Sequence, residues 1–191
     1  ELSSKYSSNY LYQRKKSPEL VNNFNYDTTS FLNKYLELKK KYEIYPQISK
    51  TSIYDNNKEI FVLSSISNST ILMCNENGYY PIVNTDKYGF INDNNFWSKD
   101  NSHLIIVGDS WMTTACHPYE DGVAGQFQKI LEEKNINLSP ITLSHGNNGP
   151  LMQLGNIIEY IDQLSPKIVL WVYYDGGDLS DLNRELKNKI L

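Results

Sequence analysis

The spacing of apolar and polar positions changes twice along the 191-residue chain. Residues 1–26 are polar and rich in Ser, Asn and Lys, a composition typical of a linker or stalk. A helical spacing of apolar residues then predicts a helix from Thr28 to Lys41, with Asp27 or Thr28 capping its start. Pro46 stops this helix.

Short apolar runs separated by turns follow in residues 52–91. The runs 60–63, 70–73 and 79–83 predict strands, and Asn75-Glu-Asn-Gly78 predicts a turn between the last two. Together with the preceding helix, this pattern predicts a small N-terminal helix plus β-rich appendage that occupies residues 27–100.

From Ser102 onward the pattern is βαβαβα. Residues 104–107, 141–143 and 167–174 predict three strands, and the first is a continuous apolar run, as buried parallel strands are. Strands that alternate with helices predict a parallel sheet. Residues 101–191 are therefore expected to form an α/β domain, a flavodoxin-like three-layer sandwich that is incomplete at its C-terminal end.

Three helices are predicted to connect and follow these strands. The first has an expected inner face made of Val123, Phe127, Ile130 and Leu131. The second opens with Gly149-Pro150, with Pro at the first helical position, and its expected inner face is made of Leu151, Leu154, Ile158 and Ile161. The third begins at Asp178, and Asp181 places a further acidic residue in its first turn.

Composition and charge narrow the range of functions. The net charge of -4 gives no basic face for nucleic acid. No apolar run is long enough to span a membrane, and the chain does not begin with Met, so a membrane contact is expected only through a missing N-terminal anchor. No Cys or His spacing indicates a metal, and the 15 Tyr are compatible with sugar binding or with ordinary cores.

Three loops of small and polar residues leave the carboxyl ends of the predicted parallel strands, where α/β sheets place their chemistry. They are Gly108-Asp109-Ser110, residues 144–149 and residues 175–178. A Ser at a sharp strand-to-helix turn exposes its hydroxyl and offers a backbone N–H to an oxyanion. A Gly-Asp turn followed by a Ser cap is the structural alternative.

Residues 105–110, Ile-Ile-Val-Gly-Asp-Ser, resemble the first sequence block of SGNH/GDSL hydrolases. Residues 145–154 resemble the second block, and residues 171–179, Trp-Val-Tyr-Tyr-Asp-Gly-Gly-Asp-Leu, resemble a third block that reads Tyr-Tyr-Glu-Gly-Asn-Asp-Leu in one bacterial subgroup. Residues 74–80 and 86–90 resemble segments that precede the hydrolase domain in that subgroup. The resemblance covers about Tyr45 to Glu185.

The resemblance implies a role for individual residues. Ser110 matches the nucleophile, and its N–H matches one oxyanion donor. Gly146 matches the second donor, whereas Gly149 is expected to cap the following helix. The third donor of the family is an Asn side chain, and the matching position here is Gly177. Supporting positions, including substitutes for that missing amide, are Asp109, Asn147, Asn148 and Asp178.

The family's fourth block, Asp-x-x-His, supplies the catalytic base and does not occur in these 191 residues. His103 is expected at the start of a strand, at the end of the sheet opposite the site. His117 follows the nucleophile, and we expect it to pack or to face solvent. His145 lies at the right strand end, where a structural role is favoured over a catalytic one.

The resemblance implies an extracytoplasmic serine ester hydrolase or acyltransferase. Its expected partner is an acylated carbohydrate, above all O-acetyl groups of a surface or secreted polysaccharide, and it needs no cofactor. The given chain is expected to be an inactive fragment, because the base is absent. The alternative is a catalytically inactive SGNH-like domain that binds a glycan or a partner protein. The oligomeric state does not follow from the sequence.

The two cysteines, Cys74 and Cys116, fall in different halves of the chain. Two buried thiols and a disulfide both fit the sequence. The subgroup that the chain resembles carries both positions in the same local motifs, which favours the disulfide. Such a bridge would make the appendage one wall of the substrate cleft.

Overall fold

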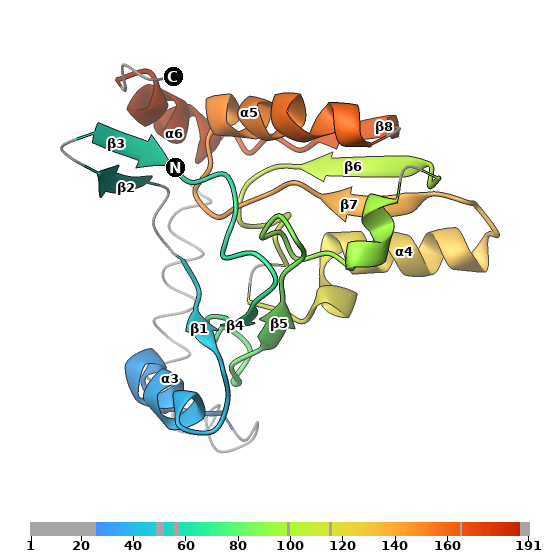
Figure 1. Cartoon of the computed structure of the whole chain (residues 1–191). Coiled ribbons are helices and arrows are strands. Elements are labelled where there is room, and N and C mark those ends of the chain that lie inside the picture. The colour runs from blue at the N-terminus through green and yellow to red at the C-terminus, as the bar shows by residue number, and fades with distance from the viewer. Residues whose placement is uncertain are drawn as a thin grey trace.

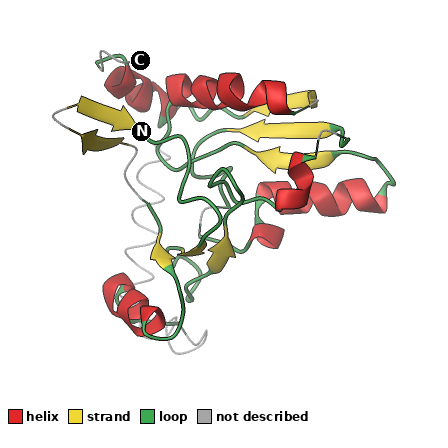
Figure 2. Ribbon diagram, in the orientation of Figure 1, coloured by secondary structure: helices red, strands yellow, loops and turns green. Residues whose placement is uncertain are grey.

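The computed structural model describes residues 26–48, 52–55, 58–98, 100–114, 116–164 and 166–187. The chain is mixed α/β, and its C-terminal half is built on a three-stranded parallel sheet with the strand order β7-β6-β8 (Figures 1 and 2). The N-terminal half carries helix α3 and short strands. The predicted linker at residues 1–26 lies, except for Tyr26, outside the described residues.

Strand β6 (His103–Val107) is the centre of the sheet, and all five of its residues are buried. It pairs in parallel with β7 (Ser139–Thr142) on one side and with β8 (Pro166–Trp171) on the other. Alternate β6 side chains enter two apolar clusters, since successive side chains of a strand point to opposite faces. Ile105 and Val107 pack with Ile141 and Leu143, whereas Leu104 and Ile106 pack on the other face.

Helices cover both faces of this sheet. Helix α4 (Val123–Glu133) lies on one face, and α5 (Pro150–Tyr160) and α6 (Asp178–Glu185) lie on the other, as Figure 1 shows. Short 3-10 turns flank them: η1 (Asn94–Trp97), η2 (Tyr119–Asp121) and η3 (Ile161–Gln163). Gly149 is the N-cap of α5 and Pro150 its first residue, so the predicted start of this helix is confirmed.

The predicted inner faces of two helices are partly wrong. On α5, Leu154 and Ile158 are exposed, and the buried residues are Met152, Gln153, Asn156 and Tyr160. The helix is rotated about its axis from the predicted orientation so that two amide side chains, Gln153 and Asn156, are buried. Each of them finds hydrogen-bond partners inside the protein. Gln153 contacts Trp171 and Asp178, and Asn156 Nδ2 donates to the Leu143 carbonyl over 3.0 Å. On α4, Ile130 is exposed as well.

Strand β8 is an edge of the parallel sheet within the described residues. Its sequence is as apolar as that of a strand buried on both faces, yet Ile168 is 50% exposed and Val169 is 41% exposed. Their side chains point to opposite faces of the sheet. These residues are the ones that a further strand with its covering layers would bury.

The appendage contains more strands than the sequence predicted. Helix α3 (Phe31–Lys39) is followed by a sheet with the order β1-β4-β5, made of β1 (Tyr45–Pro46), β4 (Thr70–Leu72) and β5 (Ile82–Asn84). A separate antiparallel hairpin joins β2 (Ser52–Asp55) to β3 (Lys58–Phe61). Neither β1 nor β2 was predicted. The predicted strand 60–63 overlaps β3 only in its first two residues.

Helix α3 begins later than predicted because a different residue caps it. Ser30 Oγ accepts the backbone N–H of Asn33 at 3.3 Å and is the N-cap. Asp27, the expected cap, instead accepts the N–H of Thr29 and forms an ion pair with Lys34. The helix ends at Lys39, two residues before the predicted end.

Asp86 joins the appendage to the parallel sheet. Its buried carboxylate accepts hydrogen bonds from the Tyr88 and Phe90 backbone and from the Asn92 and Trp97 side chains. The Asn92 amide in turn pairs with both backbone groups of Thr142 on β7, at 2.8 and 3.0 Å, as a neighbouring strand would. Phe90 and Trp97 pack in the same apolar cluster as β6 and β7, so the two halves share a core.

Among the described residues, no helix combines the length and apolar character that crossing a membrane requires.

Candidate functional site

Ser110 lies in a tight turn directly after β6. Gly108 starts this turn, and a Cβ there would stand 2.6 Å from Met112 Cγ, so only glycine fits without a shift of that side chain. The Asp109 carboxylate accepts the N–H of Trp111 at 2.9 Å, and Thr113 donates its hydroxyl to the Ser110 carbonyl at 2.9 Å. The expected strand-to-helix turn is not found, because residues 110–114 form turns and α4 begins only at Val123.

The loop after β7 brings Gly146 to Ser110. A Cβ built on Gly146 would lie 3.8 Å from the Ser110 Cβ, and no other contact would crowd it. Residues that are 36 positions apart in sequence therefore meet at the carboxyl end of the sheet. The next residue, Asn147, is exposed and has a φ of 61°, in the left-handed region that Asn tolerates better than most residues.

Ser110 opens into a cleft of about 380 Å³, a volume within the range of small-molecule sites. Trp111, Thr113 and Thr114 line it from the same turn, and Trp111 is 65% exposed. The opposite wall comes from the appendage, through Gln47, Cys74 and Glu76. Further lining residues are Cys116, His117, Asp121, Gly122 and Val123.

The appendage is bound to this wall covalently. Cys74 and Cys116 form a disulfide with a Cα–Cα distance of 4.9 Å, so the predicted bridge is confirmed. Beside it, Asn77 Nδ2 lies 3.1 Å from His117 Nδ1. The expectation that the appendage forms a wall of the Ser110 cleft is confirmed by the same residues. The bonded sulfurs are no longer thiolates, so Cys74, Cys116 and Glu76 do not make a metal site.

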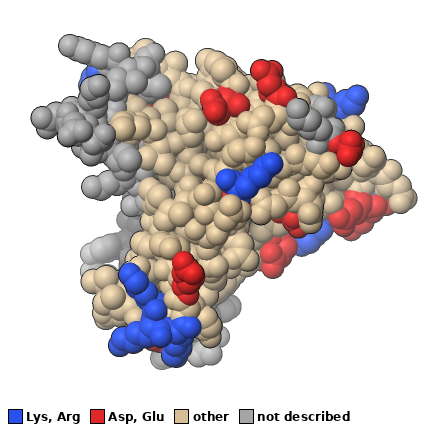
Figure 3. Space-filling view, in the orientation of Figure 1, with Lys and Arg blue, Asp and Glu red and all other residues tan. Residues whose placement is uncertain are grey.

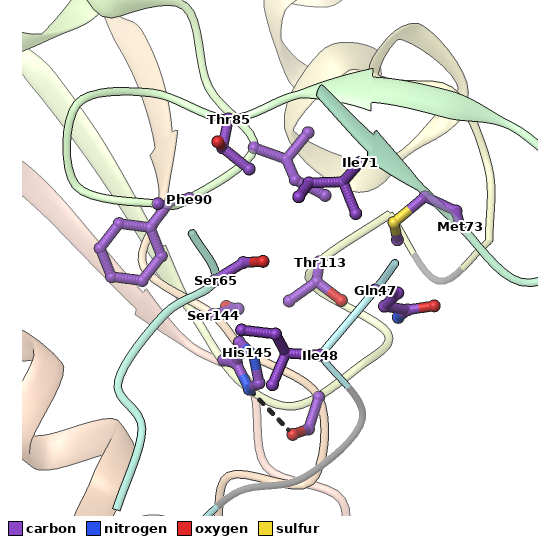
Figure 4. Close-up of a pocket in the computed structure, with 13 residues that line it drawn as sticks. Gln47, Ile48, Ser65, Ile71, Met73, Thr85, Phe90, Thr113, Ser144 and His145 are labelled. Atoms are coloured by element: carbon purple, nitrogen blue, oxygen red, sulfur yellow. Dashed lines mark hydrogen bonds between the residues drawn. The ribbon is translucent and has the colours of Figure 1, made fainter. Parts of the chain in front are cut away.

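A second, smaller cavity borders Gly146 on the side of the appendage (Figure 4). Its volume of about 30 Å³ has room for one or two water-sized groups. Ile71, Met73 and Phe90 from the appendage face Thr113, Ser144 and His145 across it, as Figure 4 shows. Gln47 and Thr113 line both this cavity and the Ser110 cleft, so the two spaces are neighbours.

The third loop, after β8, is organised by a buried carboxylate. Asp178, the first residue of α6, is 1% exposed and accepts the Tyr174 N–H at 2.6 Å and the Gln153 amide at 3.2 Å. Gly177 is the N-cap of α6, and a Cβ there would stand 3.0 Å from Tyr174 Cδ1. Asp178 therefore shapes the loop, and Gly177 offers only its backbone.

Two residues at the end of α6 hold the loop that carries Gly146, and neither was singled out from the sequence. The Glu185 carboxylate is fully buried and accepts the N–H groups of Gly149 at 2.8 Å and Leu151 at 2.9 Å. Arg184 donates to the Asn147 carbonyl at 2.6 Å. Glu185 thus satisfies orphan donors at the start of α5, and burial raises its pKa.

The two Asn side chains considered as oxyanion donors differ in position. Asn148 is fully buried, and its Nδ2 points to the Leu63 carbonyl at 3.5 Å, while its Oδ1 has no hydrogen-bond partner among the described residues. Its amide is thus directed toward the appendage. Asn147 is exposed at the rim of the loop, next to Gly146.

The three histidines occupy three different environments. His103 is fully buried at the start of β6 and lies 2.7 Å from the Phe96 carbonyl, at the end of the sheet opposite Ser110, as predicted. His145 is buried, with Nδ1 3.1 Å from the Gly146 carbonyl, and burial lowers its pKa. His117 lines the Ser110 cleft. Among the described residues, no hydrogen bond joins a histidine to the Ser110 hydroxyl.

Asp109 is half-buried beside Ser110, and its charge is disfavoured there. Burial raises its pKa, the N–H of Trp111 opposes this effect, and the nearby Asp178 and Asp181 carboxylates raise the pKa further. Three carboxyl groups, those of Asp109, Asp178 and Asp181, thus lie near this end of the sheet, and Arg184 pairs with Asp181 at 3.2 Å. Such a site suits a neutral substrate better than an anionic one.

Comparison of the chain with models of protein families, with curated proteins and with solved structures gives no match.

Proposed function

We propose that this chain is the nucleophile-bearing part of an SGNH-type serine esterase or acyltransferase with a flavodoxin-like three-layer fold. The observation that carries the proposal is the meeting of Ser110 and Gly146. Both positions match the family's nucleophile and oxyanion glycine by sequence, and the structure brings them within 3.8 Å, measured from a Cβ placed on Gly146. In this proposal the Ser110 Oγ attacks the ester carbonyl while its proton passes to the base of the triad, and the N–H groups of Ser110 and Gly146 stabilise the oxyanion. The bond to the sugar oxygen then breaks, and the protonated alcohol leaves with the acyl group on Ser110.

The shape of the site supports a short acyl group on a carbohydrate. The small cavity next to Gly146, about 30 Å³, matches an acetyl methyl group better than a long acyl chain. The larger cleft, about 380 Å³, has room for a sugar ring beside the exposed Trp111. An aromatic face of this kind is typical of sites that handle amphipathic ligands. The proposed substrate is an O-acetylated polysaccharide outside the cytoplasm.

Two observations favour a different function for the chain as given. Among the described residues, no hydrogen bond joins a histidine to the Ser110 hydroxyl, and Gly177 stands where the family has a donor amide. A domain that recognises O-acetylated glycan, or a partner protein, without turning it over is the second candidate. It uses the same cleft.

Two assays separate these candidates. We expect the 191-residue chain to turn over p-nitrophenyl acetate little or not at all, because a triad without its base keeps only modest catalysis. The full product of its gene, whatever its length, should hydrolyse the ester and lose that activity on Ser110→Ala. Turnover by the 191-residue chain that Ser110→Ala abolishes would refute the missing base and point to His117 or His145.

The second assay measures binding of the polysaccharide in place of its turnover. The second candidate predicts that the full product binds an O-acetylated polysaccharide more tightly than its de-O-acetylated form, measured by calorimetry, with no acetate released. Release of acetate refutes the binding-only function.

Gly155→Ala is the matched control for any glycine variant of the site, because a Cβ there meets only Leu63 at 3.6 Å.

A further inference from the structure

Helix α3 presents an outward face that no described part of the chain covers. Leu32 is 62% exposed and Leu36 is 47% exposed, and none of the nine residues of the helix is buried. With 100° per residue, Leu32, Leu36, Lys39 and Lys40 share one side of the helix. We call these four residues the α3 face.

The opposite side of α3 attaches it to the appendage. The Phe31 ring lies 6.0 Å from the Tyr80 ring, and Lys34 forms an ion pair with Asp27 over 3.0 Å. The contacts of Phe31 and Lys34 fix which side of α3 faces outward, so exposure of the two leucines follows from the way the helix is held. Lys41 pairs with Glu37 on the same segment at 3.7 Å and takes no part in this attachment.

Charge is distributed unevenly over the molecule. Among the described residues, residues 26–43 hold four Lys against three Asp or Glu, and the rest hold seven Lys or Arg against seventeen Asp or Glu. Figure 3 shows the Lys cluster gathered over α3, apart from the acidic residues of the sheet domain. Lys39 and Lys40 form no ion pair with a described residue, and Lys39 lies over the Tyr35 ring.

We propose that the α3 face docks on an anionic lipid surface. Leu32 and Leu36 can enter the headgroup boundary while Lys39 and Lys40, on long flexible side chains beside them, bind the lipid charge, the two interactions that hold interfacial helices. The acidic remainder of the protein is repelled by the same surface. Both effects orient the molecule with α3 toward the lipid and the parallel sheet away from it.

The test is co-sedimentation of the 191-residue chain with vesicles of phosphatidylglycerol and phosphatidylcholine in equal parts, against vesicles of phosphatidylcholine alone. We expect binding to the anionic vesicles only, and weaker binding as salt is raised. Lys39→Gln with Lys40→Gln should lower the partition coefficient about 30-fold, from about fivefold for each lysine at a lipid surface. Leu32→Ser with Leu36→Ser should lower it roughly tenfold or more.

Matched controls lie on α4 and at its C-terminal end. Ile130 is 48% exposed, so Ile130→Ser changes an equally exposed apolar residue, and Lys129→Gln with Lys134→Gln removes two other exposed lysines. Neither control should change vesicle binding by more than about twofold. Circular dichroism of each variant checks that the fold is kept.

Three results would overturn the proposal. Equal binding to both kinds of vesicle, or none, removes the role of anionic lipid. Binding to the anionic vesicles that neither the lysine pair nor the leucine pair of substitutions weakens assigns the lipid contact to another part of the chain. Self-association without vesicle binding, abolished by the leucine variants in sedimentation velocity, assigns it to a second copy of the chain.

Discussion

The disulfide between Cys74 and Cys116 should account for a large part of the stability of this chain. The two residues are 42 positions apart, and a bridge that closes a loop of this length restricts the unfolded chain by about 4 kcal/mol in the chain-entropy model. The total stability of a domain is typically about 5–15 kcal/mol. Replacing both cysteines by Ala should therefore bring the protein close to its unfolding threshold.

Loss of the disulfide should destabilise the protein mainly by freeing the unfolded chain, and the folded structure should change little. The appendage is also held to the sheet through the Asp86 hydrogen bonds and through the cluster of Phe90 and Trp97. Without the disulfide, these contacts still dock that end of the appendage. We therefore expect the double Ala variant to fold at low temperature with an unchanged circular dichroism spectrum, and to lose the contact between Asn77 and His117 at the cleft first.

The assay is urea unfolding of the oxidised protein and of the double Ala variant. With a typical slope of ~1–3 kcal/mol per molar urea, a loss of about 4 kcal/mol moves the midpoint by roughly 1–4 M. Reductant should destabilise the wild type by a similar amount and leave the double variant unchanged. A difference below about 1 kcal/mol, or two free thiols on titration of the denatured, oxidised protein, would refute the reasoning.

Three further predictions concern single residues. Gly149→Ala places a Cβ 2.7 Å from Glu185 Oε2 and should lower the free energy of unfolding in urea by about 1–3 kcal/mol. Gly155→Ala should leave that free energy unchanged or raise it, and equal effects of the two variants would argue against the close packing at Gly149. Burial lowers the pKa of His145, so the unfolded chain binds the proton more tightly than the folded chain, and the free energy of unfolding should fall as pH drops below 6.5. His145→Gln should flatten that part of the profile of stability against pH, and an unchanged profile would contradict this role of His145. Gly177→Asn supplies the side-chain amide that the proposed family carries at this position and should raise kcat of the full gene product, by up to ~10²–10³-fold; an unchanged or lower kcat would show that the place is already filled.

Local sequence patterns predicted the parts of the fold that depend on local chemistry. The continuous apolar run of β6 predicted a buried central strand, and Gly149-Pro150 predicted the start of α5, because neither depends on distant residues. The disulfide followed from the resemblance to a family. The inner face of α5 was misjudged, because Gln153 and Asn156 are buried by partners that lie far along the chain.

The candidate site was predicted only in part for the same reason. Its strand-end loops, with Ser110 and Gly146, carry recognisable local motifs. The opposite wall comes from the appendage. Its Cys74 and Glu76 lie in the segment 74–80, which carries a recognisable motif, whereas Gln47 belongs to no motif and was not predicted. The role of Glu185 at the loop of Gly146 depends on how α6 packs against α5, which no local spacing encodes.

The most direct test of the proposed function is acetate release from an O-acetylated polysaccharide by the full gene product, with Ser110→Ala beside Ser98→Ala as the control. Ser98 is an exposed serine that does not line the cleft, and among the described residues its hydroxyl accepts the Asp100 N–H. The account predicts release by the wild type and by Ser98→Ala, and at least a ~10³-fold loss in Ser110→Ala. Unchanged release by Ser110→Ala would contradict the assignment of Ser110 as the nucleophile.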